Sequence, residues 1–289
     1  MAKINNRERV SSSLSQNQPL VSVLIPTYNS VFTIAACINS VKAQTYQNVE
    51  IIVIDNHSTD GTRAVAESLG AKTLIKGPER SAQMNYGAQC ASGIYLLRVD
   101  SDMILDTDLI QKCLSLCFDG AQAVIIPVLP HLHGPQNFWV SCRMLEQKML
   151  IDDMVNVAPR FIFKQIFLAV NGYDERIVAW EDYDLHNRLI SSGVQTVSLK
   201  TSALWHLGEA SSLSEIVRRM VKYGKTGSLG LFTKKHGSSG LKQISIFRPS
   251  FFRHKGYFFV DPSHFIGILL MKGVQSCSFV FGILIKKFD

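Results

Sequence analysis

Apolar runs alternate with amphipathic segments from Val21 to His206. The run Val21 to Pro26 has the composition of a buried strand, and residues 31–42 carry apolar side chains at helical spacing. The same alternation predicts further strands at 49–54, 73–75, 94–99, 123–127 and 194–199, and further helices at 62–69, 81–90, 108–117, 138–150 and 184–190. Residues 161–168 are predicted to be extended. A repeated order of strand and helix predicts an α/β fold, with a mostly parallel sheet and helices on both faces.

Two carboxylates follow the predicted strand at 94–99. Asp100 and Asp102 stand two residues apart, with Ser101 between them. Ligands of open α/β sheets bind outside the carboxyl ends of the strands, so the pair lies where chemistry is expected. Neighbouring like charges favour a cation, and carboxylates combined with substrate phosphates suit Mg²⁺ or Mn²⁺. The pair is therefore a candidate metal site.

Two further acidic features follow predicted strands or loops. Asp55 ends the run 49–54, and Glu181 and Asp182 precede the helix predicted at 184–190. A helix cap or a turn residue is the alternative interpretation of Asp55. For Glu181 the alternative is a solvated acid near a helix N-terminus, where the macrodipole favours negative charge.

Several phosphate-binding and catalytic motifs are absent from the sequence. The first predicted strand is not followed by G-x-G-x-x-G, and the chain has no G-x-x-x-x-G-K-[ST] loop. A nucleotide diphosphate would therefore be held by a metal and by side chains. The chain also has no G-x-S-x-G elbow, which argues against an α/β-hydrolase.

The net charge of +7 is unevenly distributed. Residues 208–289 contain thirteen Lys and Arg against four Asp and Glu, a net charge of +9, whereas the remainder has seventeen against nineteen. A basic region of this kind indicates an anionic partner, such as a membrane surface, a lipid phosphate or nucleic acid. A solvated basic face without a partner is the alternative.

The end of the chain contains a basic amphipathic segment at 214–223 and a nearly apolar segment at 265–285. At helical spacing, the polar side of the second segment contains Lys272, Gln275, Ser276, Lys286 and Lys287. The apolar side contains Leu270, Val274, Cys277, Phe281 and Leu284. We interpret this segment as an amphipathic helix in the plane of a membrane. A membrane span and burial against the main domain are the alternatives.

Residues 1–18 are polar and lack the apolar core of a signal peptide, so export is not indicated. The six cysteines are scattered through predicted helices and strands, which is typical of reduced cytosolic proteins. We predict a flexible N-terminus at 1–18, a catalytic domain at 19–207 and a basic, amphipathic region at 208–289.

Five segments in sequence order resemble the signature of family 2 glycosyltransferases. They are Val23 to Asn29, Ile54 to Thr62, Asp100 to Asp102, Asn171 to Glu175 and Trp180 to Asp182. The resemblance implies a GT-A fold, which is Rossmann-like, for the domain at 19–207. It also implies an inverting reaction, a nucleoside-diphosphate sugar donor and Mn²⁺ or Mg²⁺ as cofactor.

The resemblance also implies roles for individual residues on the donor side. The residues implied to bind the nucleotide sugar are Pro26, Thr27, Tyr28, Asn29, Asp55, Arg80, Asp100 and Ser101. Within this set, Asp55 lies near the base, Arg80 lies near the diphosphate, and Asp100 holds the ribose. The metal is implied to bind Asp102, with Asp100 and His206 as further ligands. For His206, a structural role is the alternative.

On the acceptor side, the resemblance implies that Asp182 is the general base. An inverting transfer needs one base on the acceptor hydroxyl and one cationic centre on the departing diphosphate. Asp182 and a metal at Asp102 meet these two requirements. Glu181 would orient the acceptor or tune its neighbour.

The sequence departs from the family pattern in two places. Asp55-Asn56-His57 stands where many relatives have paired acids, so the choice of nucleotide is open, with UDP preferred and GDP as the alternative. The Q-x-x-R-W stretch of processive polysaccharide synthases is absent, which favours the transfer of a single sugar.

The sequence therefore predicts a cytoplasmic glycosyltransferase of the hexosyltransferase type, bound peripherally to an anionic membrane surface. Its expected acceptor is a hydroxyl group, lipid-linked or on a precursor of a cell-surface glycan. Nucleic acid is not an expected partner, and the oligomeric state is open. The alternatives are a sugar-phosphate nucleotidyltransferase and a membrane-associated protein that binds nucleotide sugars without catalysis.

Overall fold

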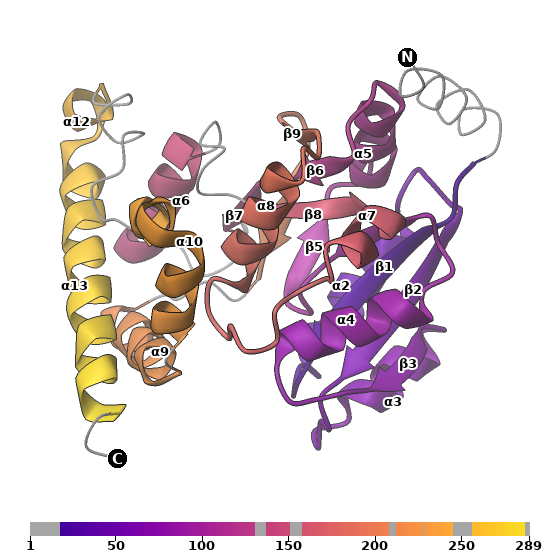
Figure 1. Cartoon of the computed structure of the whole chain (residues 1–289), viewed down its shortest axis with the longest axis horizontal. Coiled ribbons are helices and arrows are strands. Elements are labelled where there is room, and N and C mark those ends of the chain that lie inside the picture. Colours follow the sequence, from indigo (N-terminus) through magenta and orange to yellow (C-terminus); the bar gives the residue numbers. More distant parts are fainter. Residues whose placement is uncertain are drawn as a thin grey trace. The chain divides into compact units, whose positions relative to one another are not determined.

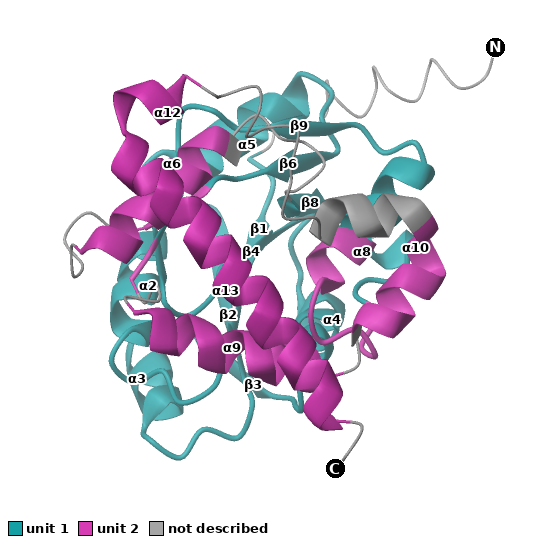
Figure 2. Cartoon of the chain, turned by 90° about the vertical axis from the view of Figure 1, so that its left-hand side faces the viewer, with its two compact units in different colours: residues 1–127, 158–173, 185–205 teal, residues 128–157, 174–184, 206–289 magenta. Residues whose placement is uncertain are grey.

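The computed structural model describes residues 18–130, 137–150, 158–207, 212–226, 228–244 and 256–286. The predicted flexible N-terminus lies outside the described residues except for Gln18. The chain forms two compact units (Figure 2). Unit 1 comprises Met1–Pro127, Ala158–Tyr173 and Leu185–Trp205, and unit 2 comprises Val128–Val157, Asp174–Asp184 and His206–Asp289.

Unit 1 is built on a seven-stranded sheet of order β3-β2-β1-β4-β8-β6-β9 (Figure 1). Its strands are β1 (Val21–Thr27), β2 (Val49–Asp55), β3 (Lys72–Ile75), β4 (Tyr95–Arg98), β6 (Ala123–Ile125), β8 (Pro159–Phe163) and β9 (Thr196–Ser198). Neighbouring strands are parallel except for β8, which is antiparallel to both β4 and β6. The predicted α/β fold with a mostly parallel sheet is confirmed.

The register of the central strands brings their carboxyl ends to one edge of the sheet. Thr27 pairs with Asp55, and Leu24 pairs with Arg98. All seven residues of β1 are buried, as expected for a central strand with both faces covered. The residues that follow β1, β2 and β4 therefore begin at the same edge.

The helices of unit 1 are α2 (Ile34–Lys42), α3 (Thr62–Ser68), α4 (Arg80–Cys90), α5 (Leu109–Phe118), α7 (Lys164–Ala169) and the later turns of α8 (Glu181–Ser191). Helix α4 lies across the sheet (Figure 1), and its Met84 packs with Leu24 and Ile54. A Cβ atom at Gly87 would lie 2.8 Å from the Ile54 side chain. The glycine therefore lets α4 approach β2 closely.

The extended conformation predicted for residues 161–168 is wrong in its second half. Strand β8 ends at Phe163, and α7 begins at Lys164. Phe167 of α7 is buried in the core of unit 1. A short apolar run fits either a strand or a buried helix, and here packing against the sheet selects the helix.

Strand β10 (Leu204–His206) is the middle strand of a separate three-stranded sheet and lies beside β5 (Met103–Leu105). The sequence pattern did not predict β5, because a strand of three residues gives almost no periodic signal.

Unit 2 contains β7 (Val128–Pro130), α6 (Phe138–Leu150), the first turn of α8, α9 (Leu213–Lys225), α10 (Ser228–Ile244), α12 (Tyr257–Val260) and α13 (Pro262–Lys286). The helices predicted at 138–150 and 214–223 are confirmed. Helix α10 is broken at Gly237, where φ is 55°. Of the basic, amphipathic region predicted at 208–289, residues 208–211, 227, 245–255 and 287–289 lie outside the described residues.

Helix α13 is continuous over 25 residues, although it contains three glycines. It crosses α9 where Gly282 meets Gly224 (Figure 2). A Cβ atom at Gly224 would lie 2.3 Å from the Phe279 carbonyl oxygen, and one at Gly282 would lie 2.4 Å from the Val221 carbonyl oxygen. These two glycines therefore allow the close packing of the helices.

Lys272, on the polar side predicted for α13, faces the interior of unit 2. Lys272 forms an ion pair with Glu146 of α6, whose side chain is fully buried and also pairs with Arg143 at 2.7 Å. Ile268 packs beside this pair with Cys142 and Met149. Among the described helices, α13 is long and apolar enough to cross a membrane by length and composition, with a mean hydropathy of 1.9.

Candidate functional site

Asp55 ends β2 at the carboxyl edge of the sheet and is almost completely buried. Its Oδ2 accepts a hydrogen bond of 2.9 Å from the Ser58 backbone N–H, and its Oδ1 accepts one from the Ser58 hydroxyl. The carboxylate therefore fixes the loop between β2 and α3. This is the turn role that the sequence offered as the alternative, and an Asp in it keeps lone pairs for a ligand.

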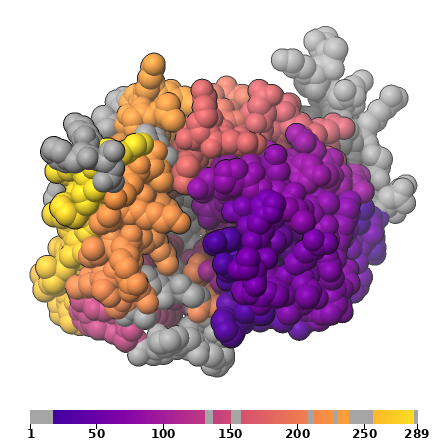
Figure 3. Space-filling view, turned by 90° about the horizontal axis from the view of Figure 1, so that it is seen from below, coloured from indigo at the N-terminus to yellow at the C-terminus, as the bar shows by residue number. Residues whose placement is uncertain are grey.

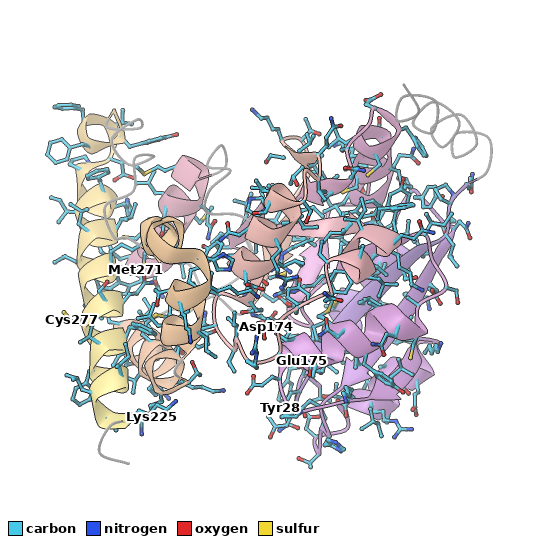
Figure 4. All side chains as sticks on the ribbon, in the orientation of Figure 1. Tyr28, Asp174, Glu175, Lys225, Met271 and Cys277 are labelled. Carbon is cyan, nitrogen blue, oxygen red and sulfur yellow. The ribbon has the colours of Figure 1, made fainter. Side chains whose placement is uncertain are left out.

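The predicted nucleoside residues lie at the end of β1 and in the loop that follows. Pro26 and Thr27 are buried, whereas Tyr28 is 61% exposed (Figure 4). The Asn29 backbone N–H donates to Ser58 Oγ at 2.8 Å, and Asn29 Oδ1 accepts from the Thr59 N–H at 3.0 Å. The loops after β1 and β2 therefore form one hydrogen-bonded surface.

A third loop, after β4, joins this surface through Ser101. The hydroxyls of Ser101 and Ser30 lie 2.8 Å apart in a hydrogen bond. Ser101 is nearly buried, so its hydroxyl braces two loops of the sheet edge. The loop that carries residues 100 and 102 is thereby tied to the loop after β1.

Three arginines converge on Asp100. Arg98 Nε lies 3.2 Å from Asp100 Oδ1, Arg160 Nη2 lies 3.1 Å from Oδ2, and Arg80 Nη1 lies 3.9 Å from Oδ1. Burial alone would raise the pKa of Asp100, but the three guanidinium groups hold this pKa well below its usual range. Guanidinium groups also bind phosphate, so three of them at one place suit an anionic ligand.

The arginines come from three different elements. Arg98 is the last residue of β4, Arg160 lies in the antiparallel strand β8, and Arg80 is the first residue of α4. Arg98 also donates from Nη1 to the Tyr173 hydroxyl at 3.2 Å. Within the described residues, the buried Nη1 of Arg160 has no hydrogen-bond partner. Arg80 stands at a helix N-terminus, which itself favours anions.

The segment Asn171 to Tyr173 is locked onto α4. The Asn85 side chain accepts from the Tyr173 N–H at 2.8 Å and donates to the Tyr173 carbonyl at 2.9 Å. Gly172 has φ of 57°, and a Cβ atom there would lie 2.4 Å from Asn85 Oδ1. The glycine is therefore required by both conformation and space.

Asp102 is partly exposed at the same sheet edge. Cys37 lies behind this loop, and burial, with Asp100 and Asp102 nearby, raises the pKa of its thiol. Among the described residues, no group of three or more His, Cys, Asp or Glu side chains could hold a metal ion. A divalent metal fits here only if most of its ligands come from diphosphate and water, a common arrangement for Mg²⁺.

His206 ends β10 and is the first residue of the last segment of unit 2. In unit 1, the preceding residues are fixed by Asp106, which accepts from the Ala203 N–H at 2.8 Å and from Trp205 Nε1 at 2.7 Å. The structure therefore anchors the chain directly before His206, and the proposed ligand role of His206 stays a prediction.

Glu181 and Asp182 lie in unit 2 and begin helix α8, three residues earlier than the predicted helix. We call Glu181, Asp182 and Asp184 the acidic turn. Glu181 is 3% exposed, so it is not the solvated acid considered from the sequence. Trp180, with φ of 66°, precedes the turn, and its carbonyl accepts from the Asp184 N–H at 3.0 Å.

The acidic turn is held by α10. Asp184 is fully buried, and its Oδ1 lies 2.7 Å from Lys235 Nζ and 2.8 Å from His236 Nε2. Lys235 also lies 3.1 Å from Asp174 Oδ2, which Arg176 contacts at 2.8 Å. Arg176, burial and Lys235 act on Asp174 with the net effect of lowering its pKa. Lys235 thus links the segment after Tyr173 to the acidic turn.

Sequence reasoning missed Arg98, Arg160 and the pair Lys235 and His236. Arg98 could have been found from the sequence, because it is a charged residue inside an apolar strand. In an extended segment, residues two apart point to the same side, so Arg98 and Asp100 are expected on one side of the sheet. Arg160 and Lys235 had none, since their partners are distant in the sequence.

Residues 22–167 match the family model described as Glycosyl transferase family 2. The chain is 28% identical over 272 residues to an uncharacterized glycosyltransferase of Rickettsia typhi, covering 79% of this chain and 84% of the relative. It is 30% identical over 197 residues to chondroitin synthase of Escherichia coli, covering 65% of this chain and 29% of the relative.

Solved structures with the same fold include the mannosyltransferase PcManGT of Pyrobaculum calidifontis in complex with GDP-Man and Mn²⁺. It has a TM-score of 0.60 at 13% identity and covers 92% of this chain and 88% of its own. TarS of S. aureus in complex with UDP has a TM-score of 0.54 at 15% identity and covers 92% and 90%. These likenesses support the predicted GT-A fold.

Proposed function

This chain belongs to glycosyl transferase family 2 and is a glycosyltransferase, and from this premise we propose that it transfers one sugar from a nucleoside-diphosphate sugar to a hydroxyl acceptor with inversion. Solved proteins of the same fold are complexes with UDP, UDP-GlcNAc and GDP-Man, which supports a nucleotide-sugar donor. UDP is the proposed nucleotide. Family membership excludes the nucleotidyltransferase and the non-catalytic binder as descriptions of this chain.

The observation that carries the donor proposal is the convergence of three arginines on Asp100. Arg80 and Arg160 contribute two of the three guanidinium groups, and both are within 4 Å of the carboxylate. Guanidinium groups bind phosphate through paired hydrogen bonds, and one nitrogen of Arg160 is available for this among the described contacts. The diphosphate is proposed to lie here, and the nucleoside against Thr27 to Asn29 and Asp55.

Asp102 is the residue proposed to hold Mn²⁺ or Mg²⁺. The oxygens of Asp100 already face arginines, so Asp100 is the weaker candidate as a ligand. When bound, the metal would supply positive charge that stabilises the departing diphosphate. Structures of the same fold that contain Mn²⁺ or Mg²⁺ with nucleotides support this assignment.

Asp182 is the proposed base. The acceptor oxygen attacks the anomeric carbon, its proton passes to the Asp182 carboxylate, and the bond from that carbon to the diphosphate oxygen breaks. The N-terminus of α8 favours a negative charge at this position. Glu181, buried beside it, is proposed to orient the acceptor.

The proposed location is the cytoplasmic face of a membrane, with a lipid-linked acceptor or a precursor of a cell-surface glycan. The excess of nine positive charges in residues 208–289 supports a peripheral contact with anionic lipid.

Two substitutions test the assigned roles. The protein is incubated with a panel of UDP- and GDP-sugars, Mn²⁺ and lipid extract, and release of nucleotide diphosphate and transfer to acceptor are measured separately. For Asp182→Asn we expect transfer to fall by about 10²- to 10⁴-fold with unchanged donor binding, because only the base is lost. For Asp102→Asn and for chelation by EDTA we expect both activities to be lost, with Mn²⁺ restoring only the EDTA-treated protein.

The control is Asp119→Asn, an exposed acid that follows α5 in unit 1 and should retain full activity. Near-normal transfer by Asp182→Asn would exclude Asp182 as the base. Unchanged release by Asp102→Asn, or in EDTA, would exclude the metal assignment.

A further inference from the structure

Helix α13 has an exposed apolar face. Its large exposed apolar residues are Ile266, Leu269, Leu270, Val280, Phe281 and Leu284. At about 100° per residue, these positions fall within one arc of the helix together with Cys277. Cys277 and Met271 lie on opposite sides of α13 (Figure 4), and Met271 is buried. We call the exposed arc, together with the exposed part of α12, the outer face.

Helix α12 extends the outer face at the start of α13. Phe259 and Val260 are 81% and 82% exposed. Phe258 is also exposed, and its ring lies 5.7 Å from that of Phe265 in α13, so the two helices are held together. Soluble monomers rarely expose a contiguous apolar surface of this extent without a partner.

The inner side of α13 argues against a membrane span. Lys272 is paired with the buried Glu146 of α6, and Gly282 is in backbone contact with α9. A spanning helix would have to leave both helices and bring Lys272 into lipid, while Glu146 would lose its partner. Only the outer face is therefore available, and it can meet a bilayer along its length.

The positive charge of this region favours an anionic lipid bilayer over a second protein copy as the partner of the outer face. Arg218, Arg219, Lys222 and Lys225 are exposed on α9, which crosses α13 directly. The surfaces of α9 and α10, in orange, and of α13, in yellow, are contiguous (Figure 3). Residues 208–289 carry a net charge of +9, so two copies meeting through this region would repel each other, whereas anionic lipids complement the charge.

We propose that the outer face docks in the plane of an anionic lipid bilayer, and that the acceptor hydroxyl is carried by the head group of a membrane lipid. The Phe279 ring, on the inner side of α13, contacts Trp180 edge-on at 5.0 Å between centroids. Trp180 directly precedes the acidic turn. The turn thus lies about one helix diameter, roughly 10 Å, from the docked bilayer, which suits a short head group. The acceptor class rests on the proposed function, whereas the docking surface does not.

Flotation with vesicles tests the docking. The full chain is mixed with vesicles of phosphatidylcholine alone, or with about a third of phosphatidylglycerol. We expect binding to the anionic vesicles, and a loss of about tenfold or more for the variant Leu270→Gln/Phe281→Gln/Leu284→Gln. The control, Ile190→Gln, changes a residue of unit 1 that is 54% exposed and should bind normally. Equal binding of the triple variant would overturn the proposal.

Cys277 provides a probe of depth, because it is exposed whereas Cys37, Cys113, Cys117 and Cys142 are buried. In a Cys90→Ser background, an environment-sensitive fluorophore is attached to Cys277, or to Ile266→Cys or Leu284→Cys with Cys277→Ser. Quenching by lipids labelled at different depths should place all three positions at the same shallow depth. A deep position 277 between two shallow ones would indicate a span, and disulfide-linked dimers with no lipid contact would indicate a second copy. Either result overturns the proposal.

An activity assay distinguishes a failure of the docking proposal from a failure of the proposed function. If docking holds but no nucleotide diphosphate is released with any donor, the proposed function is wrong and the surface stands. If the wild type and the triple variant transfer sugar to soluble hydroxyl acceptors equally well, the proposed lipid acceptor is wrong and the proposed function stands.

Discussion

Asp100 and Glu146 are carboxylates whose pKa burial alone would raise. Each is instead ionised by cations from distant segments: Asp100 by three arginines, and Glu146 by Lys272 and Arg143. The Asp100 cluster lies at the ligand edge of the sheet, whereas the Glu146 cluster joins two helices.

The stability of the protein should depend on Glu146 at low pH. Burial raises the pKa of Glu146, but Lys272 and Arg143 outweigh it and lower this pKa from 4.5 to about 2. A lowered folded-state pKa stabilises the fold above pH 4.5, and the stabilisation is lost as the pH falls toward 2. We expect Glu146→Gln to lose about 3 kcal/mol at pH 7 and to show a flatter decline below pH 5, measured by urea unfolding.

Two variants control this measurement. Glu67→Gln removes an exposed partner of Arg63 and should change the unfolding free energy little. The double variant Glu146→Met/Lys272→Met should recover most of the lost stability, because no buried charge is left unpaired. A pH profile of Glu146→Gln that parallels the wild type would show that this pair does not control acid stability.

At the scale of single residues, the sequence predicted the acidic residues of the candidate site better than the arginines that pair with them. Asp100, Asp102 and Asp55 could be found because each follows an apolar strand, and strand ends collect ligands. Arg160 reaches Asp100 only because β8 runs antiparallel to β4, a pairing that no local pattern specifies. The roles of the predicted residues in catalysis stay predictions.

For unit 1, the sequence predicted which strands and helices exist better than it predicted where they begin and end. Apolar runs and helical spacing gave the parallel strands and their crossover helices. They failed at residues 164–169, where Phe167 packs as a helix, and at β5, which is too short to show a period. In unit 2 the three glycines of α13 lower its intrinsic helix propensity, yet Gly282 permits contact between its backbone and that of Gly224 in α9.

Replacing different glycines of α13 by alanine should therefore change the free energy of unfolding in opposite directions. Gly282→Ala places a Cβ atom 2.4 Å from the Val221 carbonyl oxygen, so we expect a loss of about 1–3 kcal/mol from displaced helices. Gly273→Ala meets nothing within 4 Å, so we expect a gain of about 0.5–1 kcal/mol from helix propensity. Thermal unfolding followed by circular dichroism measures both. A gain for Gly282→Ala equal to that for Gly273→Ala would contradict the packing account.

At the scale of the whole molecule, the residues proposed to bind the donor and those proposed to act on the acceptor belong to different compact units. Thr27, Asp55, Arg80, Asp100 and Asp102 belong to unit 1, whereas the acidic turn and His206 belong to unit 2. The sequence predicted a division at residue 207, from composition and charge. The units instead also separate residues 128–157 and 174–184 from the sheet, because contacts and not chain order define them. The predicted domain roles stay predictions.

Nucleotide binding should stabilise the whole chain and report its preference for a base. A ligand at about one hundred times its dissociation constant adds about 2.7 kcal/mol to the unfolding free energy. We therefore expect UDP with Mn²⁺ to raise the melting temperature more than GDP with Mn²⁺ at equal concentration, in differential scanning fluorimetry.

Asp55→Asn serves as the matched variant, because it keeps the shape of the side chain that accepts from Ser58. It should reduce the shift caused by UDP. A shift with GDP that equals or exceeds the shift with UDP would show that the proposed nucleotide is wrong.

Arg80 is the most distant of the three arginines from Asp100, at 3.9 Å, and its side chain is 39% exposed, compared with 12% for Arg160. Before a donor arrives, Asp100 competes with dissolved anions for this guanidinium. Inorganic phosphate meets the same competition but has no nucleoside contacts to offset it. The carboxylate thus acts as an internal competitor, and we expect a nucleotide sugar, with its proposed contacts at Thr27 to Asn29 and Asp55, to overcome it more readily than a small free anion.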